Sequence, residues 1–351
     1  MPIGYYSIMK KYMLTEWTTR TDEQYRPRVT VIVPTYNEER YIQAKLSDLL
    51  GQTYPKNLFG TVVVDDGSED GTVDQVSQWT KEHPGIDVKF FRRPAHQGKL
   101  FAFNFALRQL DESSELVVVT DADAIWDREA LSNAVSYFAD PVVGCVTCSI
   151  SYTEKKPAFA EQNYRTYYNV LRIAESKKYS TPILNGPFLA LRTKILSEKG
   201  FPKFPGSDDS IFGSFVAFIG YRSIQADNVR VEEPVRGNQF RTKVRRGNRL
   251  LLNFLNTKGY AKKLGVYTKS PFDQIWRIEW WLHVVNPWLL VTSILLLVYA
   301  LLSTSILAAV FLASGGVLLF LRPYRTWILQ QGYLVVASLR NLWTEDVQWS
   351  R

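Results

Sequence analysis

The sequence predicts an α/β protein with a mostly parallel sheet, followed by a hydrophobic helical hairpin. Between residues 28 and 120, β-branched apolar runs alternate with segments of helical periodicity. This alternation is typical of βαβ units. Residues 284–321 then form 38 consecutive positions without a charged side chain. At about 1.5 Å per residue, one helix of that length would exceed a bilayer core of about 30 Å, so two spans are expected.

The predicted elements of the sheet follow each other along the first third of the chain. A buried strand covers residues 29–33 and closes at Pro34, and a helix is expected at 38–51. Residues 1–27 have no signal-peptide pattern, and their aromatic residues recur at helical spacing, which predicts an amphipathic segment lying on a membrane or on the main domain. The remaining elements are, in order, strand 61–64, helix 73–82, strand 88–91, helix 99–110 and strand 116–120.

The composition fits a folded protein with a large core. Of the 351 residues, 46% are hydrophobic and 22% are charged, which excludes a globally disordered chain. The two cysteines, Cys145 and Cys148, lie in an apolar, β-branched run without a second pair. They are therefore expected to be buried thiols on a strand rather than a redox or zinc site. The absence of a disulfide framework indicates a reducing compartment.

Three acidic clusters carry the chemistry that the sequence predicts. Asp65-Asp66 and Asp121-Ala122-Asp123 each end an apolar run, and Asp208-Asp209 follows a Pro-Gly-Ser loop. Carboxylates at the C-terminal ends of strands in an open α/β sheet point into the ligand crevice. Like charges gathered there repel unless a cation or a proton separates them. The order predicts a metal-assisted site with a separate general base, although an aspartate after a strand is often only a helix cap.

The chain resembles family 2 glycosyltransferases of the GT-A fold, a Rossmann-like, mostly parallel mixed sheet, over residues 29 to about 213. The matching stretches are VIVPTYNEE, VVVDDGSEDGT, GKLFAFNFAL, VVVTDADA, NGPFLALR and GSDDSIFG. The resemblance implies a catalytic domain over residues 28–256 and inverting transfer from a nucleotide-sugar with Mn²⁺ or Mg²⁺. It implies that Asp123 is the metal ligand and that Asp121 is its partner, near the ribose. The nucleotide-sugar-binding positions that it implies are Pro34, Thr35, Tyr36, Glu38, Asp65, Asp66, Lys99 and Asp121.

The pair Asp208-Asp209 matches the family's acidic pair, whose second member is usually the general base. Inversion needs one base opposite the leaving group, which takes the proton of the acceptor hydroxyl as its oxygen attacks the anomeric carbon. The metal stabilises the departing diphosphate, so no side chain need protonate it. Asp209 is therefore the predicted base, and Asp208 would orient its loop or raise the pKa of Asp209 through like-charge repulsion. On the resemblance, Gly186, Pro187 and Phe188 line the acceptor entrance, although spacing alone indicates a turn.

The chain departs from its processive relatives, the cellulose- and hyaluronan-synthase-like enzymes, which carry a Gln-x-x-Arg-Trp motif. The nearest stretch runs from Gln239 to Gly247 and lacks the tryptophan that would stack under an acceptor sugar. Arg245 and Arg246 could still bind a diphosphate as bidentate donors. Two spans are also few for a polymer channel. A small processive polysaccharide synthase is therefore the alternative rather than the first prediction.

The positive excess of the chain is concentrated just before the hydrophobic stretch. Residues 236–269 hold ten Lys and Arg and no acidic residue, which indicates a surface for anionic headgroups or phosphates rather than for nucleic acid. The positive-inside rule places both termini and the catalytic part in the cytoplasm, at the cell membrane. The predicted segments are a basic and aromatic interfacial segment at 257–283, a two-helix transmembrane hairpin at 284–321 turning at Ser303-Thr304-Ser305, and a C-terminal interfacial segment at 322–351.

Together these observations predict a membrane-anchored, metal-dependent inverting glycosyltransferase. The expected donor is a UDP-sugar and the expected acceptor a lipid or lipid-linked molecule, because the basic segment and the hairpin hold the crevice at the headgroup level. A phosphate-receiver signalling domain also combines paired aspartates, a later aspartate and a lysine, but it is much shorter than the span of these motifs. A non-catalytic lipid- or nucleotide-binding scaffold would not need intact acidic clusters.

Overall fold

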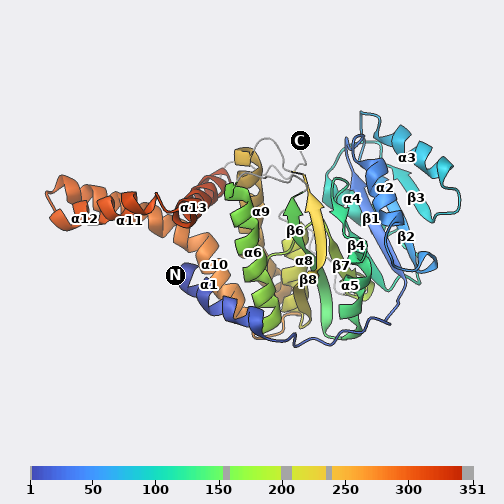
Figure 1. The fold of residues 1–351 in the computed structure, drawn as a ribbon, viewed down its shortest axis with the longest axis horizontal. Helices are drawn as coiled ribbons and strands as arrows, with labels where there is room; N and C mark the ends of the chain where they lie inside the picture. The colour runs from blue at the N-terminus through green and yellow to red at the C-terminus, as the bar shows by residue number, and fades with distance from the viewer. Residues whose placement is uncertain (1, 153–158, 199–207, 235–238, 342–351) are drawn as a thin grey trace.

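A mixed sheet forms the centre of the chain. The computed structural model describes residues 2–152, 159–198, 208–234 and 239–341. In this described part, eight strands pair in the order β3-β2-β1-β4-β7-β6-β8-β5 (Figure 1). Their bounds are β1 Val29–Thr35, β2 Phe59–Asp65, β3 Val88–Arg92, β4 Leu116–Val119, β5 Ile125–Trp126, β6 Val143–Tyr152, β7 Leu189–Arg192 and β8 Arg222–Glu233.

The half of the sheet that the sequence predicts most clearly is parallel. Strand β1 pairs in parallel with β2 and β4, and β2 pairs in parallel with β3. Strand β7 then runs antiparallel to both β4 and β6, and β5 runs antiparallel to β8. The predicted α/β class with a mostly parallel mixed sheet is confirmed. The register sets Thr35 beside Asp65, so the C-terminal ends of β1 and β2 reach the same edge of the sheet.

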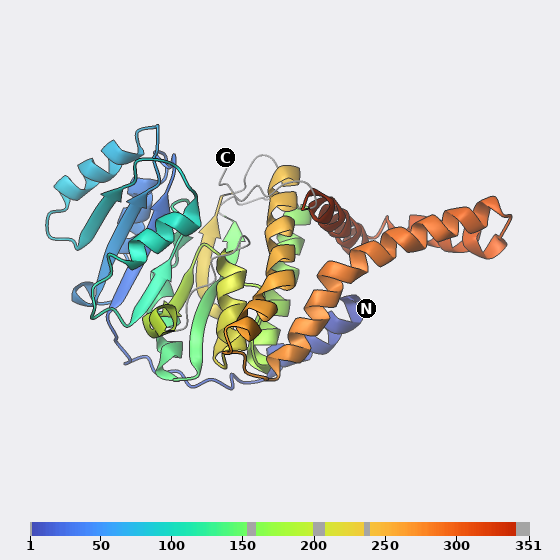
Figure 2. The ribbon, with the colours of Figure 1, turned by 180° about the vertical axis from the view of Figure 1, so that it is seen from behind.

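Helices cover both faces of this sheet (Figures 1 and 2). One core packs α2, α3 and α5 against it, and a second core packs α4 and α8 against the opposite face. The helix bounds are α1 Pro2–Lys10, α2 Ile42–Leu50, α3 Thr72–Glu82, α4 Lys99–Leu107, α5 Ala130–Ser136, α6 Phe159–Lys178, α7 Thr193–Glu198, α8 Asp208–Phe218, α9 Gln239–Lys263, α10 Phe272–Trp280, α11 Asn286–Leu302, α12 Ile306–Leu318 and α13 Arg322–Arg340.

Helix α2 begins four residues later than the sequence pattern predicts. Asn37 adopts a positive φ of 55°, and its backbone N–H donates to Ser68 Oγ at 2.9 Å. The N–H of Glu38 donates to Thr72 Oγ1 at 2.8 Å. These bonds to the loop after β2 and to the first residue of α3 satisfy donors that a helix would otherwise leave without partners at its start. The polar residues after β1 therefore build a loop at the site edge instead of a helical turn.

The N-terminal segment lies on the main domain, one of the two places that its pattern allows. Tyr5 and Met9 of α1 are buried against Leu171 and Ala174 of α6. The Tyr5 hydroxyl donates to Glu175 Oε1 at 2.6 Å. Burial, and then the charge of Glu279, raise the pKa of Glu175 well above its usual range. The helix is thus docked through an acidic group that the folded state keeps protonated to higher pH.

Replacing Glu175 with glutamine should remove a pH-dependent loss of stability. A carboxyl whose pKa is raised by folding contributes stability below its unfolded pKa and loses it as pH rises through its folded pKa. E175Q should therefore gain in Tm over the wild type between pH 5 and pH 8, by about 2–4 °C for each kcal/mol. Thermal unfolding in detergent at several pH values measures this. The exposed substitution E69Q is the control, and curves for E175Q and wild type that stay parallel would contradict the expectation.

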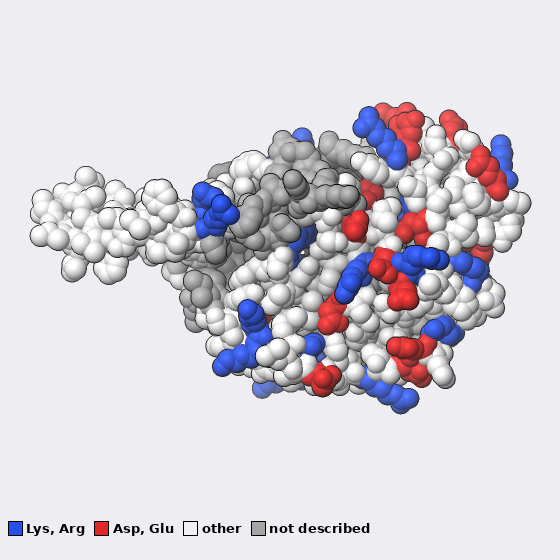
Figure 3. Space-filling model, in the orientation of Figure 1, with Lys and Arg blue, Asp and Glu red and all other residues white. Residues whose placement is uncertain are grey.

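A helical hairpin projects from the domain beside α13 (Figures 1 and 2), and its visible surface carries no charged side chains (Figure 3). Helix α10 continues through a π-helical turn, Trp281–Val285, into α11, so that Phe272–Leu302 is one apolar helix of 31 residues, long enough to be a candidate membrane span. Pro287 lies in the first turn of α11, directly after this π turn. A proline removes one helical hydrogen bond, and the wider π turn just before it accommodates the break.

The predicted turn of the hairpin is found where the sequence places it. Thr304 has a positive φ of 66°, and Ser305 caps α12 by accepting from the N–H of Ala308 at 3.4 Å. Helix α12 has 13 residues and is about 20 Å long, short of a bilayer core of about 30 Å. Membrane crossing by both helices stays a prediction.

Two predicted segment boundaries fall inside helices. The boundary after residue 256 divides α9, and the boundary after residue 283 divides the continuous helix 272–302. Helix α13 packs on α9 through Leu334 and Ala337.

Both cysteines are buried free thiols on β6, as expected.

Candidate active site

The candidate site lies at the C-terminal ends of β1, β2 and β4. These strands are continuous runs of buried β-branched residues, and each is followed by polar residues at the same sheet edge. Thr35 ends β1, Asp65 ends β2, and Asp121 comes two residues after β4. Three stretches that are far apart in the sequence therefore deliver their polar groups to one edge, as open α/β sheets do.

One carboxylate oxygen of Asp65, at the predicted nucleotide pocket, has no hydrogen-bond partner among the described residues. Its side chain is buried, and Oδ2 accepts the N–H of Ser68 at 3.1 Å, with Arg92 Nε 3.7 Å away. Oδ1 is buried and has no hydrogen-bond partner within the described chain. A buried acceptor without a partner is costly, and a donor group of a bound nucleotide would relieve that cost.

Asp66 has a different surrounding from Asp65, because its oxygens are engaged by the protein itself. Oδ2 accepts the backbone N–H groups of Gln97 at 3.0 Å and Gly98 at 2.6 Å, and Oδ1 is paired with Arg93. His96 Nδ1 also lies 2.8 Å from Oδ2. The carboxylate thus fixes the loop that leads directly into Lys99, so its contribution to the site is to position that loop.

Tyr36 and His96 lie against each other beside Asp66. Their rings are stacked with centroids 3.8 Å apart. The loop position of His96 predicts an exposed histidine, but the structure turns it inward, with 19% of its side chain exposed. Its place beside Asp66 depends on a tertiary contact that no sequence pattern indicates. Pro34, Thr35 and Glu38 lie at the same strand end, and all three are buried.

A glycine defines the space where the carboxylates converge. A Cβ added to Gly186 would lie 3.3 Å from Asp209 Oδ2, 3.6 Å from Lys99 Nζ and 3.8 Å from Asp121 Oδ2. Lys99 Nζ itself donates to Asp121 Oδ1 at 2.5 Å. The predicted base, the predicted lysine and the first aspartate of the D-x-D motif are therefore gathered within 4 Å of one point.

Alanine at position 186 should fill this space without unfolding the chain. The added methyl group would contact the ends of side chains rather than backbone, and Gly186 is not among the residues with positive φ. We expect G186A to keep its Tm within a few degrees and to lose sugar transfer by about 10²-fold, as a displacement of about 1 Å at reacting groups can cost. Transfer assays beside thermal unfolding measure both. Gly85, which has open space around its Cβ position, is the control, and an active G186A would contradict this geometry.

Asp209 lies in the first turn of α8, and its Oδ1 accepts the backbone N–H of Ser210 at 2.8 Å. This local bond leaves Oδ2 as the oxygen nearest to the Gly186 space. The bond to Ser210 and the predicted base role thus involve different oxygens of one carboxylate. The side chain of Asp208, like residues 199–207 before it, lies outside the described residues.

The loop of Gly186, Pro187 and Phe188 is held from below by a residue that sequence reasoning missed, Asn185. Its Nδ2 donates to the Cys148 carbonyl at 2.7 Å, and its Oδ1 accepts from Arg172 at 2.8 Å. The motif NGPF contains Asn185, but only the packing shows that its side chain is buried and points away from the site. The Pro187 carbonyl also accepts from Thr120 Oγ1 at 2.8 Å.

The two arginines of the Gln-x-x-Arg-Trp-like stretch lie on α9. Arg246 is within 3.9 Å of Glu233 Oε2, at the end of β8, where Arg165 pairs with the same carboxylate at 2.8 Å. Glu232, the residue before it, pairs with Ile125, two residues after the D-x-D motif. This connection brings Arg246 toward the strand after Asp123, although not into the group around Gly186.

The oxygen ligands at this edge fit a hard divalent cation. Mg²⁺ and Mn²⁺ are commonly held by one or two carboxylates together with substrate phosphates. Asp121 offers a carboxylate at the glycine-lined space, and Asp123, buried two residues on, offers a second. Within the described residues, no group of three or more His, Cys, Asp and Glu could hold a metal by itself. The arrangement fits a metal whose coordination is completed by a bound diphosphate.

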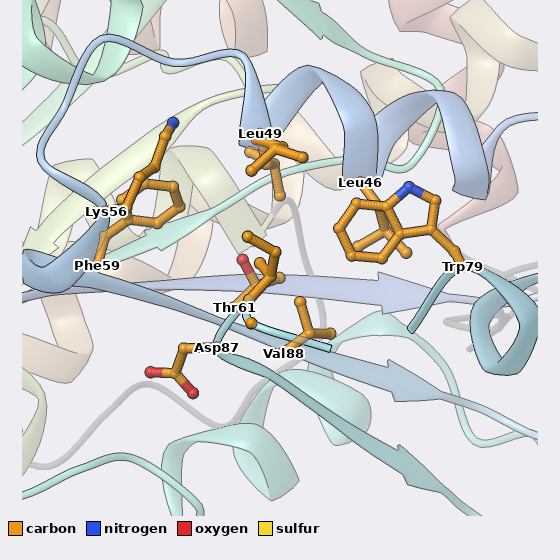
Figure 4. A pocket seen from close by; sticks show the side chains of 11 residues that line it. Leu46, Leu49, Lys56, Phe59, Thr61, Trp79, Asp87 and Val88 are labelled. Atoms are coloured by element: carbon orange, nitrogen blue, oxygen red, sulfur yellow. The ribbon is translucent and has the colours of Figure 1, made fainter. Parts of the chain in front are cut away.

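A small pocket elsewhere does not belong to this site. It is lined by Leu46, Leu49, Phe59, Trp79 and Val88, between α2, α3 and the starts of β2 and β3 (Figure 4). The starts of these parallel strands are at the opposite edge from Asp65. Its largely apolar lining indicates imperfect packing of core side chains.

Comparisons with known proteins show the family of the chain. The model of Glycosyl transferase family 2 matches residues 30–200, and the model of Glycosyl transferase family group 2 matches residues 116–322. The chain belongs to the family 2 glycosyltransferases. The resemblance carried by the six sequence stretches is confirmed.

A solved structure is similar to this family 2 glycosyltransferase over nearly its whole chain. The mannosyltransferase PcManGT from Pyrobaculum calidifontis, in complex with GDP-Man and Mn²⁺, is 39% identical with a TM-score of 0.86, and the match covers 98% of this chain and 95% of that chain. The predicted GT-A fold is confirmed.

Curated relatives match over a shorter range. Glycosyltransferase AglE of Haloferax volcanii is 28% identical over 178 residues, which are 50% of this chain and 56% of AglE. The poly-beta-1,6-N-acetyl-D-glucosamine synthase of Staphylococcus epidermidis is 24% identical over 203 residues, 57% of this chain and 48% of that protein. The chain thus spans about half the length of these relatives.

Proposed function

We propose that the chain is an inverting glycosyltransferase that moves one sugar from a nucleotide-sugar to a lipid or lipid-linked acceptor at a membrane surface. The observation that carries the proposal is the convergence of Asp209, Lys99 and Asp121 on the space at Gly186. A base, a cation and a carboxylate that suits a metal lie together there, beside the strand ends where a nucleotide would bind. Family membership supplies the reaction class, and this convergence supplies the place.

In the proposed reaction, Asp209 acts as the general base. Its carboxylate takes the proton of the acceptor hydroxyl while that oxygen bonds to the anomeric carbon, and the bond from that carbon to the diphosphate breaks. The electron pair of the broken bond leaves with the nucleoside diphosphate. When bound, a divalent cation would stabilise the developing diphosphate charge. Lys99 adds a second positive charge at the same place.

GDP-mannose is the first donor to test, ahead of the UDP-sugar that the sequence predicts. The 39% identical PcManGT was solved with GDP-Man, and the match covers nearly all of both chains. The open oxygen of Asp65 would accept a base N–H from either guanine or uracil. A UDP-sugar therefore remains the second candidate, and Mn²⁺ the first metal, with Mg²⁺ next.

The lipid acceptor and the membrane location rest on the projecting hairpin. The 18-residue window of helix 272–302 that could span a membrane is apolar and only 6% buried, and large exposed apolar surfaces mark interaction with a membrane or a partner. The basic residues of α9 come just before it in the chain. In a cell membrane with both termini cytoplasmic, as proposed, this arrangement presents the crevice to lipid headgroups.

A processive polysaccharide synthase is the second candidate, favoured by one observation, the partial match to the poly-beta-1,6-N-acetyl-D-glucosamine synthase. The missing tryptophan after Arg245 and Arg246 speaks against it. Product length separates the two candidates. Mass spectrometry should show one added sugar per acceptor, and a ladder of long chains would support the synthase instead.

Donor hydrolysis without acceptor tests the function most simply. The full-length protein in detergent is incubated with Mn²⁺ and each of GDP-mannose, UDP-glucose and UDP-N-acetylglucosamine. Slow release of the nucleoside diphosphate from one donor, abolished by EDTA, is the expected result. Failure to bind or hydrolyse any nucleotide-sugar, in a protein shown to be folded, would contradict the proposal.

A further inference from the structure

Lys45 on α2 is a lysine without solvent exposure, and it lies beside the D-x-D turn. Its relative exposure is 0%. Nζ donates to the carbonyl of Ala124 at 2.9 Å and to Asp48 Oδ2 at 3.0 Å. It also lies 4.1 Å from the centre of the Trp126 ring, in the geometry of a cation–π contact. These three contacts of the ammonium belong to α2 and to the segment just after Asp123.

A buried lysine is expensive unless its contacts compensate the lost hydration. Burial lowers the pKa of Lys45 to about 8, against the opposing effect of Asp48. An alkyl side chain of similar size would pack in the same core without that cost. The ammonium therefore does something at this position beyond filling space, and its bond to the Ala124 carbonyl is the contact that an alkyl side chain could not replace.

The same cluster continues to the acceptor loop. Both oxygens of Asp48 lie 3.2 Å from the N–H of Trp126, which donates to this carboxylate. The indole Nε1 of Trp126 donates to the Pro187 carbonyl at 3.1 Å, and its ring packs on Phe188 with centroids 4.5 Å apart. The buried cluster of Lys45, Asp48 and Trp126 therefore contacts both the turn that carries Asp121 and Asp123 and the loop that carries Gly186.

We propose that Lys45 is a positioning residue whose bond to the Ala124 carbonyl fixes the Asp121–Ala124 turn in the geometry needed to bind a divalent cation with a nucleoside diphosphate, with Asp48 as its counter-charge. The inference rests on the proposed function of the same site. Lys45 touches the turn at Ala124 and reaches the metal-binding carboxylates only through it. Partners that orient metal ligands typically change metal affinity by about 10–100-fold when they are removed.

The double variant K45M/D48N separates positioning from stability. K45M alone would leave Asp48 buried without its partner, which is strongly destabilising, whereas removal of both charges together is often tolerated. In K45M/D48N the fold should persist, but the donor to the Ala124 carbonyl is absent. D48N is the matched control, because Lys45 keeps its bond to the Ala124 carbonyl and the amide oxygen of asparagine can still accept a hydrogen bond from Lys45.

The readout is calorimetric binding of Mn²⁺ to the full-length protein saturated with GDP, and separately with UDP. We expect K45M/D48N to bind Mn²⁺ about 10-fold more weakly than wild type, D48N to stay within about twofold, and metal-free nucleotide binding to be unchanged in both. Wild-type Mn²⁺ affinity in K45M/D48N, or equal losses in both variants, would overturn the positioning role. If K45M/D48N does not fold, a D48N protein with weakened Mn²⁺ binding would overturn it and one with wild-type binding would support it. A wild-type protein that binds neither nucleotide would overturn the proposed function as well.

Discussion

Replacing Asp209 with asparagine should reduce sugar transfer by about 10²–10⁴-fold, the usual contribution of a general base. Asparagine has nearly the shape of aspartate, and its amide oxygen can still accept the N–H of Ser210 that holds Oδ1 in place. The oxygen beside Gly186 is replaced by an NH₂ group, which cannot take a proton from the acceptor. The fold and the site geometry are thus retained while the base is lost.

The measurement is the initial rate of transfer by D209N, beside its affinity for the donor. Donor affinity should change little, because the proposed nucleotide contacts are at Asp65 and Lys99. The substitution D111N, at an exposed position on the opposite edge of the sheet, is the matched control. Full activity in D209N would remove the base assignment, whereas equal loss of donor binding and transfer would make Asp209 a binding residue.

Replacing Asp123 with alanine should strongly weaken the metal binding on which donor binding depends. Asp123 is buried at the turn after β4, and a hard cation held by few protein ligands depends strongly on each of them. We expect the Mn²⁺ concentration for half-maximal donor binding to rise by at least about 10²-fold, and transfer to fall with it, because the leaving diphosphate loses its charge stabilisation.

A Mn²⁺ titration of nucleotide-sugar binding measures the effect in D123A. Binding of the nucleotide in EDTA provides the control, since Asp65 and the loop held by Asp66 are unchanged. An unaltered titration in D123A would show that the metal ligand lies elsewhere. The mild variant D123N should be intermediate, because its amide oxygen can still coordinate.

Much of the sheet could be predicted because its signal is local. Strands β1, β2 and β4 are short runs of Val, Ile and Thr bounded by Pro or Asp, and such runs are legible without tertiary information. The start of α2 could not be predicted in the same way. Asn37 and Glu38 would suit a helix, but bonds to Ser68 and Thr72 from a different loop compete with it.

The acidic residues of the site could be named from the sequence, but not their separate roles. Asp65 and Asp66 are adjacent and chemically identical, yet one keeps an open oxygen and the other is taken up by the loop before Lys99. Only packing distinguishes them. Lys45 shows the same limit, because a lysine on an amphipathic helix is expected to face water, and its burial follows from the carbonyl and carboxylate that meet it.

The hydrophobic end of the chain combines both situations. Its turn at Ser303-Thr304-Ser305 follows from the sequence, and the structure has the turn there. The continuity of α10 with α11 does not follow, because a proline at 287 predicts a helix start. The π turn that makes the proline tolerable is a feature of backbone geometry without a residue signature of its own.

The stereochemistry of the product tests directly whether one carboxylate acts as base opposite the leaving diphosphate. Proton NMR of the anomeric position after transfer from GDP-mannose, which is an α-linked donor, would report it in a single experiment. We expect a β-linked product, formed by wild type and at least about 10²-fold more slowly by D209N. An α-linked product would contradict it, since retention of configuration requires a mechanism that a single base opposite the leaving group does not provide.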